Sequence, residues 1–183
     1  MPEYRRIRLK GSCVFITLIT FNRASILVEP SALRLLRHVW KKVAKRLPFS
    51  TDAVCILPDH IHMMITLPEN DSDYSIRIRE IKRLFTRYYQ NSIEEIAARN
   101  ASRIRQKEAT IWQRRFWEHT IKDEQDYENH FDYIHFNPVK HGYVRSVVEW
   151  EWSSFHRYVR QGVYEPDWGD GLIMGKIETN YGE

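Results

Sequence analysis

Two histidines separated by one residue, His60 and His62, stand inside an otherwise apolar run that spans residues 55–67. Proline and aspartate at residues 58–59 predict a turn, so the pair lies on the strand that follows it. Alternate side chains leave a strand on the same face, about 6 to 7 Å apart. His60 and His62 therefore point the same way. Two imidazoles on one rigid strand can bind a divalent metal ion, and they can equally form hydrogen bonds with their neighbours.

A tyrosine and an asparagine four residues apart, Tyr133 and Asn137, form a second candidate pair. Side chains at this spacing share one face of a helix. A tyrosine hydroxyl can act as a nucleophile in a step that forms a covalent intermediate. Ordinary structural roles remain open for both residues: Tyr133 suits an amphipathic core position, and Asn137 suits a helix cap ahead of Pro138.

The elements that position these residues follow the order β-α-β-β-α-β. β-branched and aromatic runs predict strands, and apolar residues at helical spacing predict helices. Strands are predicted at residues 14–21, 52–57, 60–67 and 111–121, and helices at 30–47 and 76–88. This order is that of the ferredoxin-like split βαβ fold, an α+β class with an antiparallel sheet and both helices on one face.

A further helix over residues 123–136 carries Tyr133. We expect it to stop at Asn137, because Pro138 disfavours helical geometry in the residue before it. The polar residues 91–109 are interpreted as a connection. One domain is expected to span residues 1–183, with an aromatic-rich tail from about residue 144 wrapping it.

The composition excludes several classes of protein. The chain has 183 residues, of which 43% are hydrophobic, which is typical of a globular protein rather than a disordered one. Its two cysteines, Cys13 and Cys55, lie in apolar runs and are interpreted as buried free thiols. The sequence shows no signal peptide and no run of about 20 apolar residues, so we expect a soluble, intracellular protein without a membrane span. The net charge of +4 permits a polyanionic partner.

Several motifs together resemble one superfamily. They are Thr17-Leu-Ile-Thr-Phe-Asn-Arg, Leu57-Pro-Asp-His-Ile-His, Trp112-Gln-Arg-Arg, Tyr133-Ile-His-Phe-Asn-Pro-Val-Lys-His-Gly-Tyr and Trp152-Ser-Ser-Phe-His. The set resembles the single-tyrosine HUH endonucleases, and within them the REP-associated tyrosine transposases, which are relatives of the IS200/IS605 insertion-sequence transposases. The histidine pair alone is a weak signal; its order and separation from the tyrosine motif make the combination specific.

The resemblance implies an enzyme that cleaves and rejoins single-stranded, hairpin-forming DNA repeats of the repetitive extragenic palindrome type, as a monomer or weak dimer. It also implies a cytoplasmic, nucleoid-associated protein. Tyr133 would form a 5′-phosphotyrosine, and His60, His62 and Asn137 would hold a divalent ion, Mg²⁺ or Mn²⁺. Basic side chains would contact the DNA, although any one of them can be ordinary solvated surface. The candidates are Arg5, Arg6, Arg8, Arg23, Arg83, Arg87, Arg114 and Arg115, with Arg79 on the same helix as Arg83.

Two other functions stay open at this point. The first is a non-catalytic module that binds single-stranded DNA or RNA hairpins on the same fold. The second is a small hydrolase in which His60 and His62 hold Zn²⁺ with a bound water as nucleophile. A zinc site would need a third ligand, for which Asp59, His119 and His135 are conceivable, although none stands at a zinc-signature spacing.

Overall fold

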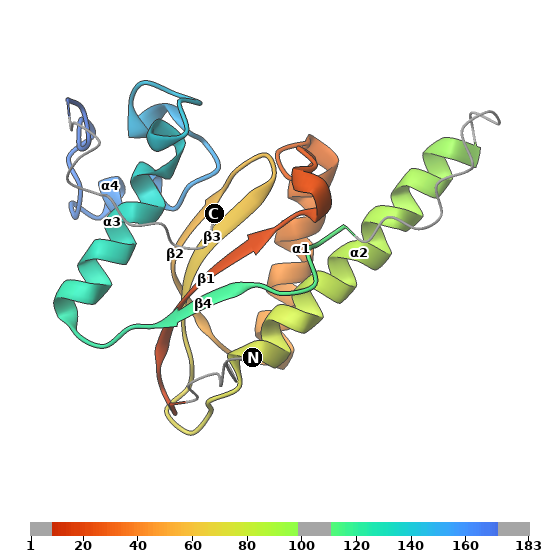
Figure 1. Cartoon of the computed structure of the whole chain (residues 1–183), viewed down its shortest axis with the longest axis horizontal. Coiled ribbons are helices and arrows are strands. Elements are labelled where there is room, and N and C mark those ends of the chain that lie inside the picture. The colour runs from red at the N-terminus through yellow and green to blue at the C-terminus, as the bar shows by residue number, and fades with distance from the viewer. Residues whose placement is uncertain (1–8, 99–110, 172–183) are drawn as a thin grey trace, which may run out of the picture.

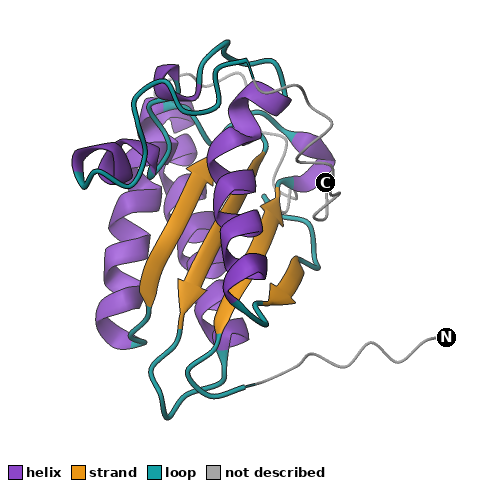
Figure 2. Ribbon diagram, turned by 90° about the vertical axis from the view of Figure 1, so that its left-hand side faces the viewer, coloured by secondary structure: helices purple, strands orange, loops and turns teal. Residues whose placement is uncertain are grey.

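The computed structural model describes residues 9–98 and 111–171, and in these residues a four-stranded antiparallel sheet lies between helices on both faces (Figure 1, Figure 2). The strands are β1 (Cys13–Ile19), β2 (Ser50–Ile56), β3 (His60–Thr66) and β4 (Trp117–Thr120). They lie in the order β2-β3-β1-β4, with every neighbouring pair antiparallel. The ferredoxin-like α+β fold predicted from the element order is confirmed, and β3 is a central strand.

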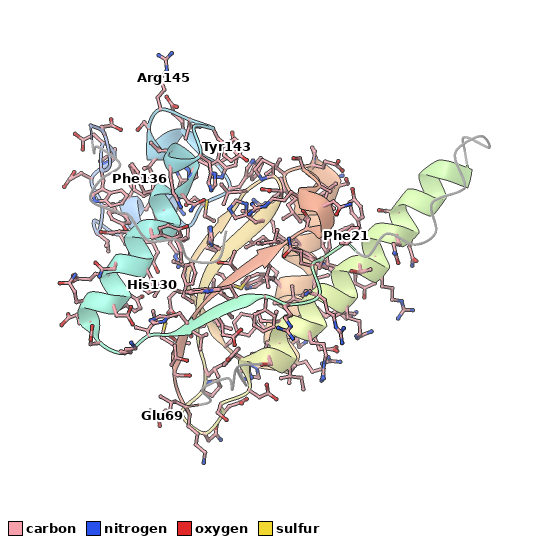
Figure 3. All side chains as sticks on the ribbon, viewed as in Figure 1. Phe21, Glu69, His130, Phe136, Tyr143 and Arg145 are labelled. Atoms are coloured by element: carbon pink, nitrogen blue, oxygen red, sulfur yellow. The ribbon has the colours of Figure 1, made fainter. Side chains whose placement is uncertain are left out.

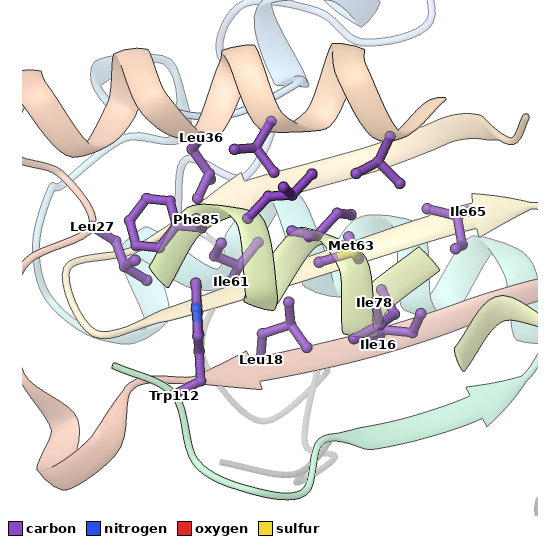
Figure 4. Packing of buried hydrophobic residues seen from close by; sticks show 14 of the residues in the cluster. Ile16, Leu18, Leu27, Leu36, Ile61, Met63, Ile65, Ile78, Phe85 and Trp112 are labelled. Atoms are coloured by element: carbon purple, nitrogen blue, oxygen red, sulfur yellow. The ribbon is translucent and has the colours of Figure 1, made fainter. Parts of the chain in front are cut away.

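Two long helices, α1 (Pro30–Arg46) and α2 (Tyr74–Ala98), cover one face of the sheet. Every second residue of β1 and β3 points toward them, because side chains alternate along a strand. The core between these layers is apolar and fully buried (Figure 4), and it includes Ile16, Leu18, Ile61, Met63, Ile65, Leu36, Ile78 and Phe85. This packed layer makes β3 a rigid support for whatever its other face carries.

The opposite face of the sheet is covered by α3 (Glu124–Lys140), which contacts β2 and β3. Short helices follow it: η2 (Val147–Glu149) and α4 (Phe155–Arg160), while η1 (Phe21–Arg23) follows β1. The described part of the tail packs on α3 through Phe155, Tyr164 and Trp168. Its backbone also joins β2, since the Ile56 N–H donates to the Trp152 carbonyl at 2.8 Å.

Both cysteines are free thiols, as predicted, although Cys13 is half-buried rather than buried. Burial raises the pKa of Cys13 to about 12 and also raises the pKa of Cys55. Neither thiol is therefore ionised at neutral pH, and neither is a candidate nucleophile.

The predicted end of the tyrosine helix is wrong: α3 continues through Pro138 to Lys140. Proline disfavours helical geometry before it but does not forbid it, and here the end of the helix is fixed elsewhere. Gly142, at φ +69°, closes a Schellman motif in which its N–H donates to the Val139 carbonyl and the Tyr143 N–H donates to the Pro138 carbonyl. The helix therefore gains a final turn that the sequence did not indicate.

Two other boundaries differ from prediction. Residues 91–98 extend α2 instead of forming a connection, because they include strong helix formers and neither glycine nor proline. The remainder of the expected connection, residues 99–109, lies outside the described residues. The predicted strand at 111–121 is regular only in β4, although Trp112 also pairs with Thr20 at the end of β1 in an isolated bridge. Between the Thr20–Trp112 and Thr17–Trp117 pairs β1 advances by three residues and the other segment by five, so the intervening residues bulge out of the ladder.

Candidate active site

The histidine pair faces α3 from the central strand. His60 and His62 are 1% and 0% exposed, and their ring centroids lie 4.8 Å apart. Each Nδ1 atom has a partner: Asp59 Oδ1 lies 2.7 Å from His60 Nδ1, and Thr17 Oγ1 lies 2.9 Å from His62 Nδ1. Partners at Nδ1 fix the orientation of both rings and leave Nε2 as the atom that can bind a metal ion.

The donor set fits a divalent ion. Within the described residues, the buried Nε2 atom of His60 has no hydrogen-bond partner, and a ligand at this position would remove that cost. Asp59, whose carboxylate orients His60, is itself held by Arg23, with Nη1 3.1 Å from Oδ2. Burial alone would raise the pKa of Asp59, but the hydrogen bonds from His60 and Arg23 together lower it to about 2. The carboxylate therefore stays ionised at neutral pH and favours a proton on Nδ1 of His60.

Helix α3 brings the second predicted pair to the histidines. The ring of Tyr133 lies 5.3 Å from the ring of His62, and the ring of His141, the residue that caps the helix, lies 5.2 Å from the ring of His60. Asn137 is four residues from each of these contacts and therefore shares their helix face. Asn137 is completely buried. The structure thus brings His60, His62, Tyr133 and Asn137 to one place between β3 and α3.

The phenol of Tyr133 is 1% exposed and lies beside a cation. The ammonium of Lys140 donates a hydrogen bond to Tyr133 Oη at 3.0 Å, and its nitrogen lies 4.7 Å from the centre of the ring. Phe15 of β1 contacts the same ring edge-on, with the centroids 6.0 Å apart. Sequence reasoning missed Lys140 and His141 because it ended the helix at Asn137.

The other tyrosine of this helix occupies a different environment. Tyr127 is half-buried and stacks on Phe131, with the ring centroids 5.7 Å apart. Burial, with a further contribution from the nearby carboxyl of Asp52, raises the pKa of Tyr127. Tyr127 therefore packs in the core beneath the tail and ionises less readily than a free tyrosine.

A second cluster of possible ligands lies at the start of α3, where His119, Asp126 and His130 place ligand atoms within 4.8 Å of one another (Figure 3 labels His130). Asp126 accepts a hydrogen bond from His119 Nε2 at 2.7 Å. The Nδ1 atom of His130 lies 2.7 Å from the backbone carbonyl of Asp126, which only an N–H can satisfy. The two rings are parallel within 9°, whereas a shared ion must lie in the plane of both rings. We therefore interpret the cluster as a hydrogen-bonded anchor between β4 and α3.

The conceivable third ligands of a zinc hydrolase are occupied elsewhere. Asp59 binds His60 through Nδ1, and His119 binds Asp126. The Nε2 atom of His135 lies 2.8 Å from Ser154 Oγ, and burial lowers the pKa of His135 to about 3. The His135–Ser154 contact stabilises the packing of the tail on α3. None of the three contacts supports a zinc site built on the histidine pair.

The predicted DNA-contacting arginines divide into three groups. Arg5, Arg6 and Arg8 lie outside the described residues. Arg23 binds Asp59, and Arg83 forms a salt bridge with Glu80 at 2.9 Å. The side chains of Arg79, Arg87, Arg114 and Arg115 are exposed.

Four basic residues line a groove of about 660 Å³ between α2 and the segment that precedes β4. They are Arg79, Lys82, Arg83 and Arg114, and the aromatic residues Trp112 and Phe116 line the same groove. Lys82 and Arg83 already have partners in the protein, so Arg79 and Arg114 are the residues of this group best placed to meet an anion. Among the helices within residues 9–98 and 111–171, none is long and apolar enough to cross a membrane.

Known proteins with similar sequences and structures agree on one family. The family of IS200-like transposases matches residues 10–137. A provisionally named REP-associated tyrosine transposase of Haemophilus influenzae is 45% identical over 180 residues, which cover 97% of this chain and 100% of the relative. The REP-associated tyrosine transposase of Escherichia coli is 44% identical over 168 residues, covering 92% and 91%.

A solved structure extends this similarity to the whole chain. It is that of a REP-associated tyrosine transposase bound to a REP hairpin, with a TM-score of 0.82, 40% sequence identity, and coverage of 100% of this chain and 98% of the other. Sequence identity of 40–45% over 91–100% of each relative shows membership of the same family, and not only a shared fold. The chain belongs to the REP-associated tyrosine transposases, DNA-processing enzymes within the IS200-like transposase family.

Proposed function

We propose that the protein cleaves and rejoins single-stranded DNA through a covalent bond to Tyr133. The observation that carries this proposal is the meeting of the phenol with two oriented, buried imidazoles: the ring of Tyr133 lies 5.3 Å from that of His62, and His60 lies next to His62 at 4.8 Å. A nucleophile beside a metal-binding pair is the arrangement that phosphoryl transfer requires.

His60 and His62 would hold a divalent ion, Mg²⁺ or Mn²⁺, with the amide oxygen of Asn137 as the third ligand. When bound, such an ion polarises the scissile phosphate and neutralises the charge that develops on its oxygens. Two imidazoles form a softer set than the oxygen ligands that Mg²⁺ prefers, so Mn²⁺ is expected to bind more tightly. Membership of the family supports the need for a divalent metal, and the buried His60 Nε2 atom supports the position.

The covalent step balances without a nucleotide cofactor. The Tyr133 oxygen loses its proton and attacks phosphorus, which forms a 5′-phosphotyrosine. The bond from phosphorus to the departing 3′-oxygen breaks, and that oxygen takes up a proton to become a free 3′-OH. Attack by a 3′-OH on the phosphotyrosine reverses the step and rejoins a strand, because the covalent link conserves the phosphodiester bond energy.

The proposed substrate is a single-stranded hairpin of the REP type, since a structurally similar relative is bound to such a hairpin. The groove beside α2 suits the DNA backbone, because Arg79 and Arg114 bring positive charge there and the half-buried Phe116 supplies aromatic surface. We further propose that Arg87 and Arg115, which are exposed, contribute charge to the same interaction.

The test is incubation with REP-type hairpin DNA and Mn²⁺, followed by denaturing electrophoresis. We expect a protein–DNA adduct with the wild-type protein and none with Tyr133→Phe. The Tyr133→Phe variant should still bind the hairpin, because the substitution removes one oxygen and almost no packing surface. Hairpin binding by the wild-type protein without any adduct would instead support the non-catalytic binding module.

A further inference from the structure

Lys140 reaches the oxygen atom that the proposed function assigns to the nucleophile. Its ammonium nitrogen lies 3.0 Å from Tyr133 Oη and 4.7 Å from the ring centroid. The two residues are seven positions apart on α3, so they lie on the same face two turns apart. This contact exists only because α3 continues through Pro138, since a helix that stopped at Asn137 would leave Lys140 in a loop.

We propose that Lys140 is a further catalytic residue, whose ammonium stabilises the negative charge on the Tyr133 oxygen before and during its attack on the phosphodiester. This inference rests on the proposed function, because it takes Tyr133 as the nucleophile. The lysine belongs to none of the predicted sites, which comprised the histidine pair, the tyrosine, the asparagine and the arginines.

The need for such a group follows from the chemistry of tyrosine. A free tyrosine has a pKa near 10, so roughly one phenol in a few hundred is ionised at pH 7.5. A cation at hydrogen-bond distance favours the ionised form, and a charge-assisted hydrogen bond is about twice as strong as a neutral one. The phenol is 1% exposed, so water screens this attraction less than it would at the surface.

Protons balance with the lysine charged throughout. Tyr133 releases its proton to water, its oxygen bonds to phosphorus, and the departing 3′-oxygen takes a proton from water. Lys140 keeps its three protons and donates one hydrogen bond at each stage. In the rejoining reaction the phenolate is the leaving group, and the same contact stabilises it. Lys140 therefore accelerates both directions.

A pH profile of cleavage must separate the effect of Lys140 from that of other side chains in contact with the phenol. His62 of β3 contacts the Tyr133 ring and can titrate, whereas Phe15 of β1 cannot. Wild-type and lysine variants are therefore compared at the same pH, so that the difference between them reports the contact of Lys140 with the phenol.

The experiment measures single-turnover cleavage of a REP-type hairpin in Mg²⁺ from pH 6 to 9.5. Lys140→Met should cleave about ten- to a hundredfold more slowly than wild type at pH 7. The difference should shrink as the pH rises, because hydroxide then ionises the phenol without help from the lysine. Lys140→Gln, which keeps a neutral donor, should show the same defect, and Lys140→Arg, which keeps the charge, should recover most of the activity.

A matched control is present on the other side of the molecule. Lys42 donates to Tyr88 Oη at 2.7 Å and lies 5.4 Å from the centre of that ring, far from the histidine pair. Lys42→Met removes the same kind of contact and should leave the pH profile unchanged. Hairpin affinity and thermal unfolding of every variant establish that the fold and the DNA-binding surface persist.

Two chemical substitutions make the assignment specific. Replacing Tyr133 with a fluorinated tyrosine that ionises near neutral pH should restore cleavage to Lys140→Met. Replacing the departing 3′-oxygen of the DNA with sulfur, which needs no proton to leave, should not restore it. Rescue by sulfur would make Lys140 the acid for the leaving group, and a defect equal at every pH would make it a phosphate contact or a structural residue. Either result overturns the proposal. An adduct that persists in Tyr133→Phe would refute the proposed nucleophile instead.

Discussion

Asp59→Asn tests whether the histidine pair is prepared as a metal site. Each carboxylate oxygen of Asp59 accepts one hydrogen bond, Oδ1 from His60 Nδ1 at 2.7 Å and Oδ2 from Arg23 Nη1 at 3.1 Å. An amide offers one acceptor and one donor. Asparagine at this position can therefore accept a hydrogen bond from only one of the two neighbours, whichever way the amide is turned.

Both orientations weaken the site. If the amide oxygen faces His60, the amide NH₂ group points at the guanidinium of Arg23, and two donors meet. If the amide is reversed, its NH₂ group donates to Nδ1 of His60 and moves the imidazole proton to Nε2, which can then no longer bind a metal ion. Loss of such an orienting partner costs about 10- to 100-fold in metal affinity, which corresponds to about 1.4 to 2.7 kcal/mol. The cost in folding stability should be smaller, about 1 kcal/mol or less, because the side chain of Arg23 is 41% exposed.

The assay is calorimetric titration of wild-type and variant protein with Mn²⁺ at pH 7.5. Asp52→Asn is the control: Asp52 is a half-buried carboxylate that accepts a hydrogen bond from Thr66 at the other end of the sheet, whereas Asp59 is buried. We expect Asp59→Asn to lose affinity while Asp52→Asn retains it. Equal Mn²⁺ affinities for wild type and Asp59→Asn would refute the reasoning, because the orientation of His60 would then not depend on the carboxylate.

Three further predictions use other parts of the structure. Tyr133→Phe should abolish both strand cleavage and the covalent adduct in denaturing gels, whereas Tyr127→Phe should retain them; the reverse pattern would identify Tyr127 as the nucleophile. Arg114→Gln should weaken hairpin binding and lower the slope of log affinity against log salt by about 1, and an unchanged slope in a fluorescence-anisotropy titration would remove Arg114 from the interface. Burial lowers the pKa of His130 more than the neighbouring carboxylate of Asp126 raises it, so its contribution to stability is complete above pH 6.5 and is lost as the pH falls below that value. Denaturant unfolding at pH 7 and pH 5 should show this loss, and His130→Gln should reduce it; a loss of the same size in His130→Gln would assign it to other groups.

The sequence predicted the residues whose positions follow from a local repeat. The two-residue repeat of a strand predicted that His60 and His62 share one face of the sheet. The repeat of a helix predicted that Tyr133 and Asn137 share one face of α3. Lys140 was missed because the proline rule describes a preference of one residue, whereas the end of α3 depends on backbone bonds around Gly142 and on the burial of Pro138. Such tertiary contributions are not visible in a local pattern.

For a related reason, the sequence could not distinguish arginines that are paired with a carboxylate of the protein from arginines that could meet DNA. A helix places many arginines on its surface, and the sequence does not show which of them a neighbouring carboxylate already binds. Arg83 and Arg46 share the carboxylate of Glu80, although Arg46 comes from α1 and is 34 residues away. Arg23, at the end of η1, similarly binds Asp59 in the turn between β2 and β3. Only the folded chain separates these paired cations from Arg79 and Arg114, which line the groove.

The candidate active site is formed by two elements, the central strand β3 and the helix α3, which are held in place by different contacts. His60 and His62 lie on the central strand, whereas the proposed nucleophile lies on α3. The ring centroid of Phe15 lies 5.5 Å from that of His62 and 6.0 Å from that of Tyr133, so Phe15 packs against both elements. The start of α3 is tied to β4 by the hydrogen bond between His119 and Asp126 and is capped by Asp123, whereas the far end carries the half-buried Lys140 next to the phenol. Because the phenol is 1% exposed, DNA can meet it only after a covering group moves. We expect the far end of α3 to move as a unit, with Tyr133 and Lys140 keeping their hydrogen bond. A shift at the Asp126 end would instead break charge-assisted hydrogen bonds that the binding of DNA does not replace.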